Sequence, residues 1–467
     1  MFVNQTPPQQ YADLRAFRQT IFSAIRKRHD AAFNLIDALL ERPKPRNIAE
    51  LSLSPHCPRQ WSSLYDAVEE AVVDTKTLEA TYTHYALKDW QEHGQHQAEA
   101  HGLPCMVVVG DASVVRRSSC RTVDGLRYCH TQSHEVNGRG IVAGHQYQLL
   151  RYVSETHSSW AMPLANDRLG EHDTQASLGA EQLQRFSMTL GADTPCLSVF
   201  DGAFGCASFL SVTQHQRCGV VARMRHDRAL FHPAADDPRK GRGAPAVYGE
   251  RFDCDDATTW SSIADCCHFT DAHHGTVVLQ RWNGLPMRPT ANDAEHRHRR
   301  QAPLTVDVLR CITHQGTPKR RVICLVLQQN AIPDPIWSQT EGLWRAFDAR
   351  PSIEASIKVS KQECSWTMPQ TFTAKAADTW THLTEIAFWH LFLVRKHNQL
   401  IRFRWQKADA PITPRRVRQS ISAILFAVGS PAALPLPRGN SLGWEKGRPR
   451  SKRKRCSVIY KTKKTAT

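Results

Sequence analysis

The sequence has no apolar stretch long enough to cross a membrane, because no window approaches the roughly 18 apolar residues that a spanning helix requires. Its first thirty residues carry acids and bases where a secretory signal would have an uninterrupted apolar segment. None of the 14 cysteines stands in a CxxC spacing, which is the spacing typical of zinc sites and redox motifs. We therefore expect a cytoplasmic protein with reduced cysteines and no membrane partner.

Acidic residues are outnumbered by basic ones, with 44 Asp and Glu against 60 Lys and Arg and a net charge of +16. Such an excess favours a polyanionic partner, because the release of counterions from phosphates drives binding. Residues 445–467 hold ten of the basic residues and one acid. Within them, GlyArgPro with Arg448 and Arg450 is typical of segments that lie in the minor groove of A·T-rich DNA. A merely solvated basic tail would have the same composition.

Two short apolar runs each end on an aspartate. Residues 105–110 read CMVVVG and precede Asp111, and residues 196–200 read CLSVF and precede Asp201. Both runs predict buried strands that terminate at the acid. Two carboxylates side by side repel each other unless a cation lies between them. Mg²⁺ is the simplest such cation, because it prefers oxygen ligands.

A third carboxylate lies in the stretch WRAFDARPSIEASIKVSK, residues 344–361. If this stretch is one helix, side chains at steps of three and four share a face, which could hold a metal ion and a phosphate together. A solvated helix face has the same pattern. Pro351 disfavours helix in the residue before it, so a helix boundary is expected at Arg350. The side chains on this face are Phe347, Arg350, Glu354, Lys358 and Lys361.

The spacing of Phe347, Arg350, Glu354 and Lys361 resembles the Tyr-Arg-Glu-Lys signature of bacterial insertion-sequence DDE transposases, with Phe in place of Tyr. The segments VGDAS around position 111, GHQYQLL at 144–150, FDGAFG around position 201 and ARMRHDR at 222–228 resemble successive blocks of one such family. They occur in the family's order, and the resemblance spans roughly residues 50–455.

The resemblance implies an α/β fold with an RNase H-like core, in which a mixed sheet is flanked by helices. Asp111 and Asp201 would lie on neighbouring strands and Glu354 on a later helix. These three would be the catalytic and metal-binding residues, and they would hold two Mg²⁺ ions with Mn²⁺ as a substitute. The cluster of Cys266, Cys267, His268, His273 and His274 lacks the paired spacing of a metal site.

Several other residues are candidates for contact with DNA. Arg350, Lys361 and Lys358 would position a phosphate near the point of cleavage. Arg223 and Arg225 would follow the DNA backbone, unless they are an ordinary surface pair. In some relatives of this kind an aromatic residue of a β-rich insertion stacks on a flipped base. Trp260 and Trp282 are the candidates for that role, although a tryptophan in a strand usually belongs to the core.

The chain divides into five expected parts. Residues 1–100 form a helical domain that recognises DNA ends or has a purely structural role, and residues 84–101 are polar enough to suggest a linker. Strands are expected at 276–282, 304–313 and 321–328, and an apolar helix at 376–396. The remaining parts are the two segments of the core, 101–232 and 331–430, the β-rich insertion, 233–330, and the basic extended tail, 431–467.

Three functions remain open. The first is a cut-and-paste DNA transposase, associated with the nucleoid, that hydrolyses phosphodiesters at terminal inverted repeats and joins the 3′-hydroxyl to target DNA. The resemblance implies that it acts as a homodimer on paired ends of double-stranded DNA. The second is an RNase H-like nuclease without strand transfer, and the third is a catalytically decayed DNA-binding remnant.

Overall fold

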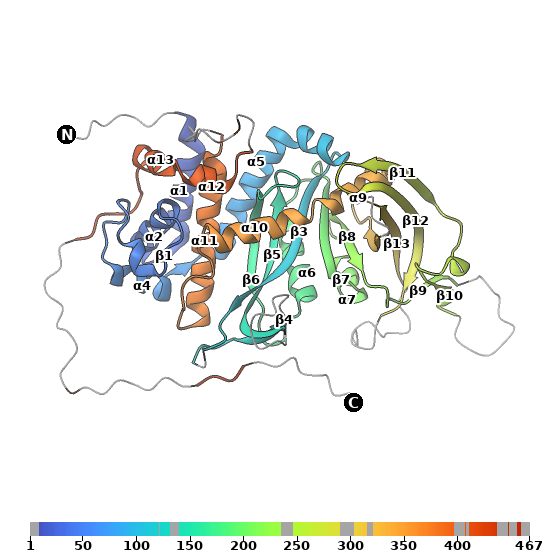
Figure 1. Ribbon diagram of the computed structural model, residues 1–467, viewed down its shortest axis with the longest axis horizontal. Helices are drawn as coiled ribbons and strands as arrows, with labels where there is room; N and C mark the ends of the chain where they lie inside the picture. Colours follow the sequence, from blue (N-terminus) through green and yellow to red (C-terminus); the bar gives the residue numbers. More distant parts are fainter. Residues whose placement is uncertain are drawn as a thin grey trace.

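One mixed twelve-stranded sheet with a group of helices at one end makes up the computed structural model (Figure 1). The described residues are 9–120, 122–130, 140–234, 246–289, 303–314, 321–396 and 411–436, with 407, 447 and 455–458. The sheet order is β10-β9-β12-β13-β14-β8-β7-β3-β5-β4, with β11 on β12 and β6 on β5.

The amino-terminal part is helical and packs against helices from the carboxyl-terminal part (Figure 1). Its central helix buries every residue from 31 to 40, and α11 lies against it. A buried ion pair between Arg18 and Asp37, with 2.7 Å between nitrogen and oxygen, joins the first two long helices. The elements are η1 (Gln9–Tyr11), α1 (Ala12–Ala24), β1 (Ile25–Lys27), α2 (His29–Glu41), α3 (Ile48–Leu51), α4 (Trp61–Glu70), β2 (Val72–Val73) and α5 (Thr75–His101).

The expected linker at 84–101 is wrong, because these residues belong to α5. The Asp74 side chain accepts a hydrogen bond from the Thr77 backbone and caps the start of the helix, and Gly102 ends it with φ +69°. Polar side chains dominate the sequence of its second half, but α5 is anchored in the core through its first half. There Tyr82 stacks on Trp389 of α11 with 5.6 Å between ring centroids.

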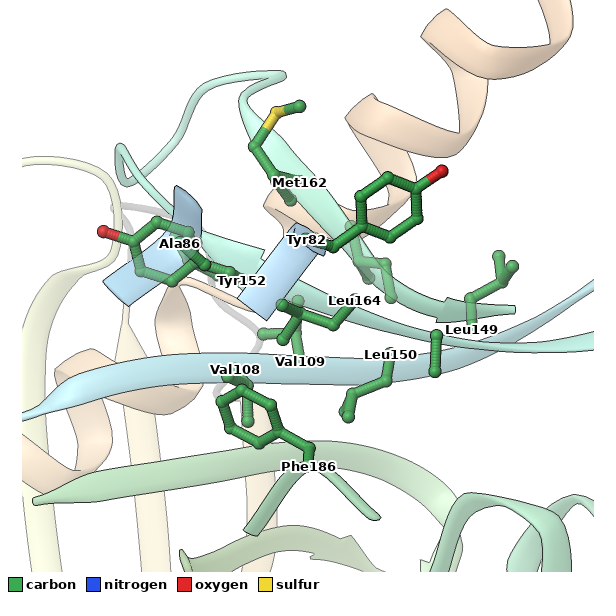
Figure 2. Packing of buried hydrophobic residues seen from close by; sticks show 14 of the residues in the cluster. Tyr82, Ala86, Val108, Val109, Leu149, Leu150, Tyr152, Met162, Leu164 and Phe186 are labelled. Atoms are coloured by element: carbon green, nitrogen blue, oxygen red, sulfur yellow. The ribbon is translucent and has the colours of Figure 1, made fainter. Parts of the chain in front are cut away.

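The middle of the sheet has the order β6-β5-β3-β7-β8. The three strands β3, β7 and β8 are parallel, whereas β5 runs antiparallel to β3, and β6 runs antiparallel to β5. Apolar residues of these strands pack with Tyr82 and Phe186 from the covering helices (Figure 2). The elements are β3 (Met106–Arg116), β4 (Arg127–His130), β5 (Ile141–Val153), β6 (Ala161–Arg168), α6 (Gln175–Ser187), β7 (Cys196–Gly205), α7 (Ala207–Thr213) and β8 (Cys218–Met224).

The β-rich segment that follows β8 continues the same sheet instead of forming a separate one. Its last strand, β14, returns to pair antiparallel with β8, from Gln328 opposite Val220 to Cys324 opposite Met224. The strands expected at 276–282, 304–313 and 321–328 are all present. The elements are β9 (Leu230–Pro233), β10 (Tyr248–Phe252), η2 (Ala257–Thr259), β11 (Asp265–Asp271), β12 (Gly275–Met287), β13 (Leu304–His314) and β14 (Arg321–Gln328).

The carboxyl-terminal helices cross the sheet and then return to the helical end of the molecule. Helix α10 contacts β3, β5 and β6, and α11 lies beside α2 (Figure 1). Serines at positions 352, 356 and 360 of α10 are buried, so small side chains let this helix approach the strands closely. The elements are α8 (Asp334–Trp337), α9 (Thr340–Asp348), α10 (Pro351–Gln362), α11 (Ala374–Val394), α12 (Pro414–Arg418) and α13 (Ile421–Val428).

Candidate active site

Two parallel strands bring the first two acids together. The register of β3 and β7 pairs Val109 with Val199 and Gly110 with Phe200, so Asp111 and Asp201 follow at the same level. The expectation that each strand ends at its acid is wrong, because β3 continues to residue 116 and β7 to residue 205. The pairing between the two strands does stop there, so the carboxylates lie at the point where the strands part.

The two residues before the acids fix this register. A Cβ atom on Gly110 would lie 2.0 Å from the ring of Phe200, so only glycine leaves room for that ring. The ring is fully buried and packs against Phe204 and Phe209, with centroid distances of 4.7 and 4.8 Å. The close fit of ring and backbone holds the two strands, and therefore the two acids, at a fixed offset.

The third acid lies on α10, just after a break between two helices. The stretch 344–361 is not the single helix that its periodicity suggests, because α9 ends at Asp348 and α10 begins at Pro351. The helix boundary predicted at Arg350 is confirmed. Proline has no backbone N–H with which to continue the hydrogen bonds of a helix. After it, the Ile353 backbone N–H donates to the Arg350 carbonyl at 3.0 Å.

The side chains of Arg350 and Glu354 nevertheless remain on the same side of the chain. The Arg350 backbone has φ −54° and ψ −39°, which is right-handed helical geometry. Its guanidinium therefore reaches one turn along the helix and donates to Glu354 Oε1 at 2.7 Å. Phe347, the position of the signature's aromatic, belongs to α9 and packs half-buried against the core.

A buried polar network attaches α10 to the sheet. The Arg151 guanidinium, on β5, donates to Ser360 Oγ of α10 at 3.1 Å and to Glu385 Oε1 of α11 at 2.7 Å. All three residues are at most 1% exposed. Loss of one partner would leave a buried charge unpaired, so the network keeps α10 at a defined height above the strands.

Asp111 has a raised pKa. Burial raises its pKa to about 6, a rise that a hydrogen bond from the Ala112 backbone and the charge of Arg350 oppose. The carboxylates of Asp201 and Glu354 also raise this pKa. Asp201 and Glu354 are therefore each within electrostatic reach of Asp111, although 89 residues or more separate neighbouring acids along the chain.

Arg350 lies between two of these acids. Its Nη1 atom is 3.7 Å from Asp111 Oδ2, and its Nη2 atom is 2.7 Å from Glu354 Oε1. The arginine side chain is 16% exposed, that of Asp111 25% and that of Glu354 57%. A positive charge thus already occupies the space between the first and third carboxylates.

The donor set suits a hard divalent cation, because Mg²⁺ is bound by carboxylates together with water and phosphate. Among the described residues, however, no three Asp, Glu, His or Cys side chains lie close enough together to hold a metal ion. Two of the carboxylates, those of Asp111 and Glu354, face the guanidinium of Arg350. The ligand type therefore fits Mg²⁺, and the side chains would have to turn toward it.

Further cations surround the acids. Burial and the charge of Arg116 lower the pKa of Lys361, while Asp111 raises it, so this lysine is within electrostatic reach of the site. Lys358 is exposed on the same helix. Arg223 and Arg225 are exposed at the end of β8.

The two tryptophans differ in their surroundings. Trp282 is 1% exposed and packs against Phe252 and Trp260, so we correct the expectation that it stacks on a base: it belongs to the core. Trp260 is half-buried, and its indole N–H donates to the Asp253 carbonyl at 2.8 Å. Arg310 covers its ring at 5.3 Å from the centroid. The expected DNA contacts of Arg448 and Arg450 lie outside the described residues.

Sequence reasoning missed a cluster at the end of α9. Asp348 accepts a hydrogen bond from His274 Nε2 at 2.7 Å, and His157 Nε2 lies 3.4 Å from its other oxygen. His157 is on the loop between β5 and β6, and His274 is on the turn between β11 and β12. Segments from three distant parts of the chain thus come into contact at Asp348, two residues before Arg350. No local sequence pattern predicts such a contact.

A cavity of about 490 Å³ lies at the opposite end of β8. It is lined mainly by polar residues of the segments 214–216 and 328–330 together with Asp307. None of the candidate site residues named above contributes to it.

A comparison with known protein families shows what this chain is similar to. The family model described as "DDE superfamily endonuclease" matches residues 19–285, which is more than half of the chain. The match includes Asp111 and Asp201 and ends before Glu354. No curated protein matches the chain. No helix among the described residues is long and apolar enough to cross a membrane. The chain belongs to the DDE superfamily endonucleases, a family of nuclease and transposase type that acts on DNA.

Proposed function

We propose that the protein is a metal-dependent DNA transposase that cleaves at the terminal inverted repeats of its element and transfers the resulting 3′ end to target DNA. The observation that carries the proposal is the position of Asp111, which lies level with Asp201 on the neighbouring strand and shares the guanidinium of Arg350 with Glu354. The register of Gly110 with Phe200 sets Asp111 beside Asp201. Glu354 shares Arg350 with Asp111.

The strand order supports an RNase H-like core. In the sequence-based expectation, the first two acids lie on neighbouring strands and the third lies on a later helix. The parallel strands β3 and β7, the antiparallel strands β5 and β6, and the crossing helix α10 agree with that arrangement. The segment from β9 to β14 would then be the insertion between the second acid and the glutamate.

Asp111, Asp201 and Glu354 would hold two Mg²⁺ ions, for which Mn²⁺ can substitute. Metal ions bound there would supply Lewis acidity and lower the pKa of a bound water. The protein side chains would orient the DNA: Arg350 by a bidentate contact to phosphate, and Lys361 as a point charge. A hydroxyl freed by cleavage and kept in this site can attack a second phosphodiester, so cleavage and joining need no covalent bond to the enzyme.

The surrounding parts would bind the remainder of the DNA. Lys358, Arg223 and Arg225 would follow the phosphate backbone, because they are exposed on elements that carry or adjoin the acids. Trp260 would be the aromatic residue of the insertion that stacks on a base. The helical amino-terminal part would bind the transposon ends, and two copies of the chain would pair them. The basic tail, with Arg448 and Arg450, would enter the minor groove.

An assay with the element's own ends tests the proposal. Purified protein, labelled DNA that carries one inverted repeat, and Mg²⁺ are incubated with a supercoiled target, and nicks, hairpins and joined products are resolved. Transposase activity predicts a nick with a free 3′-hydroxyl at the repeat and a joined product. Nicks that never lead to joining would indicate a nuclease, the activity that the family description names. Binding without any cleavage would indicate a decayed remnant.

A further inference from the structure

Arg350 occupies an unusual place for a residue expected to bind phosphate. Its guanidinium touches carboxylates, with Glu354 Oε1 at 2.7 Å and Asp111 Oδ2 at 3.7 Å. The side chain is 16% exposed, so most of it is withdrawn from solvent and from any DNA outside. In this arrangement it neutralises the acids and does not offer its donors to a phosphate.

Without a cation, the three acids would repel one another at this point of the sheet. Asp111 is largely buried, and its neighbours Asp201 and Glu354 make its ionised form still less favourable. The guanidinium offsets this repulsion with a delocalised charge that spans two carboxylates. A divalent cation bound to the same oxygens would need the space and the lone pairs that the arginine now uses.

We propose that Arg350 is the resident counter-cation of the metal-free site, and that binding of a divalent cation by Asp111 and Glu354 releases it toward the DNA phosphate. This inference rests on the proposed function. Arg350 is then a switching residue as well as a DNA contact. It holds the carboxylates while the site has no metal, and it becomes available to DNA only once the site is loaded.

Thermodynamic linkage gives this exchange two consequences. Because the guanidinium competes with the cation, removing it tightens cation binding. Because the cation frees the guanidinium, the cation strengthens DNA binding, and DNA strengthens cation binding by the same factor. The second effect needs Arg350, whereas a cation that merely screened the acids would help DNA binding in any variant.

Direct titration of the protein with Mn²⁺, without DNA, tests the competition. Wild type, Arg350→Gln and the matched control Arg225→Gln are compared by electron paramagnetic resonance of free Mn²⁺. Arg225 is an exposed arginine close to Gly202, where a Cβ atom would lie 3.9 Å from Arg225 Cγ, so its loss removes the same charge from the same neighbourhood. We expect about threefold to tenfold tighter Mn²⁺ binding in Arg350→Gln than in Arg225→Gln, as suits a partly exposed ion pair. Equal affinities would overturn the proposal.

Asp111→Asn separates a failure of this proposal from a failure of the proposed function. If Mn²⁺ binding is lost in Asp111→Asn but is equal in the two arginine variants, the metal site stands and Arg350 does not compete for it. If no variant shows binding that depends on Asp111, neither the metal site nor the competition exists. Circular dichroism checks that each variant is folded.

DNA binding tests the release. Fluorescence anisotropy with the inverted-repeat DNA is measured with and without Ca²⁺, whose oxygen preference matches that of Mg²⁺. We expect Ca²⁺ to strengthen DNA binding about fivefold more in the wild type than in Arg350→Gln, within the usual range of coupling between sites. The same Ca²⁺ effect in both proteins would contradict the release of Arg350.

Discussion

At the scale of single residues, the positions of the acids depend on the residues directly before them in the chain and beside them in space. Gly110 and Phe200 fix the offset of Asp111 and Asp201, because the phenylalanine ring fills the space that a side chain at position 110 would need. Arg350 joins Asp111 to Glu354. The geometry of the acids is thus set by packing and by one guanidinium together.

Neutralising any one of the acids should abolish cleavage without unfolding the protein. Asp111→Asn, Asp201→Asn and Glu354→Gln each remove a charge that we propose binds the metal, so we expect cleavage of the inverted repeat to fall by at least about a hundredfold. Gel electrophoresis of labelled DNA measures this. Glu363→Gln, at the end of the same helix α10, serves as the control. Cleavage by any of the three acid variants at the wild-type rate would remove that acid from the site.

The thermal stability of Asp111→Asn should be equal to or higher than that of the wild type at neutral pH. The folded-state pKa of Asp111 is raised to about 6, so ionisation of this group above that pH destabilises the folded protein. Asparagine carries no such charge. Calorimetry at about pH 7.5, above both the folded and the unfolded pKa, measures the midpoint. A midpoint several degrees lower would mean that the charge of Asp111 is needed for folding.

A methyl group at position 110 should damage the protein. In Gly110→Ala the new Cβ would meet the Phe200 ring, and we expect a loss of about 1–3 kcal/mol in the free energy of unfolding, as for other overpacked cores. Cleavage should fall as the acids shift. Gly191→Ala is the control, because its nearest neighbour would be 4.0 Å away. Phe200→Leu in the same chain should restore part of the stability, and a fully stable Gly110→Ala would contradict this packing.

At the scale of elements, α9 and α10 position the third acid relative to the strands. The Arg151 network fixes the far end of α10 through Ser360. The two histidines on Asp348 fix the end of α9 just before Arg350. The helix pair is therefore held on both sides of the residue that touches the acids.

Loss of the charge on Asp348 should slow cleavage and have only a small effect on the free energy of unfolding. Asp348→Asn weakens the contacts with His157 and His274, and we expect cleavage to fall about tenfold, because small displacements of reacting groups have large effects on rate. Glu341→Gln, on the same helix α9, is the matched control, since Glu341 pairs with Arg345 instead. Unchanged cleavage in Asp348→Asn would show that these histidines do not position the site.

Local patterns in the sequence predicted the elements of the core but not the contacts between them. Apolar runs identified β3 and β7, and Pro351 identified the break at Arg350, because both signals act within a few residues. The second half of α5 was mistaken for a linker, since its helix is stabilised by contacts with distant α11. The cluster around Asp348 likewise depends on segments that are far apart in the chain, and the fit of Gly110 to Phe200 depends on strand register.

At the scale of the whole molecule, one continuous sheet connects the strands of the first two acids to the β-rich segment. Helix α11 packs between this sheet and the amino-terminal helices. The family match spans the helices, the first two acids and part of the β-rich segment. His390 lies where the helical part meets α11, with its ring 5.1 Å from that of Phe17. The joint between the two ends of the molecule thus contains a buried titratable group.

Stability should fall in acid because of this histidine. Burial, with the charge of Arg18, lowers the pKa of His390 to about 3, below the usual value of about 6.5. Between these values the unfolded chain binds a proton that the folded one excludes, so stability is lost as pH falls below about 6.5, by up to about 1.4 kcal/mol per pH unit. Urea unfolding between about pH 7 and pH 4 measures this. In His390→Asn, the dependence of the free energy of unfolding on pH should be weaker by the contribution of about one proton. A dependence on pH equal to that of the wild type would contradict this role of His390.

In the proposed function, three acids from β3, β7 and α10 meet around a divalent cation. The most direct measurement is a crystal structure with inverted-repeat DNA and Mn²⁺, in which anomalous scattering locates the metal. We expect Mn²⁺ within about 2.3 Å of oxygens from Asp111, Asp201 and Glu354, with Arg350 turned to a phosphate. Mn²⁺ bound elsewhere, with Arg350 still paired to Asp111, would contradict the account.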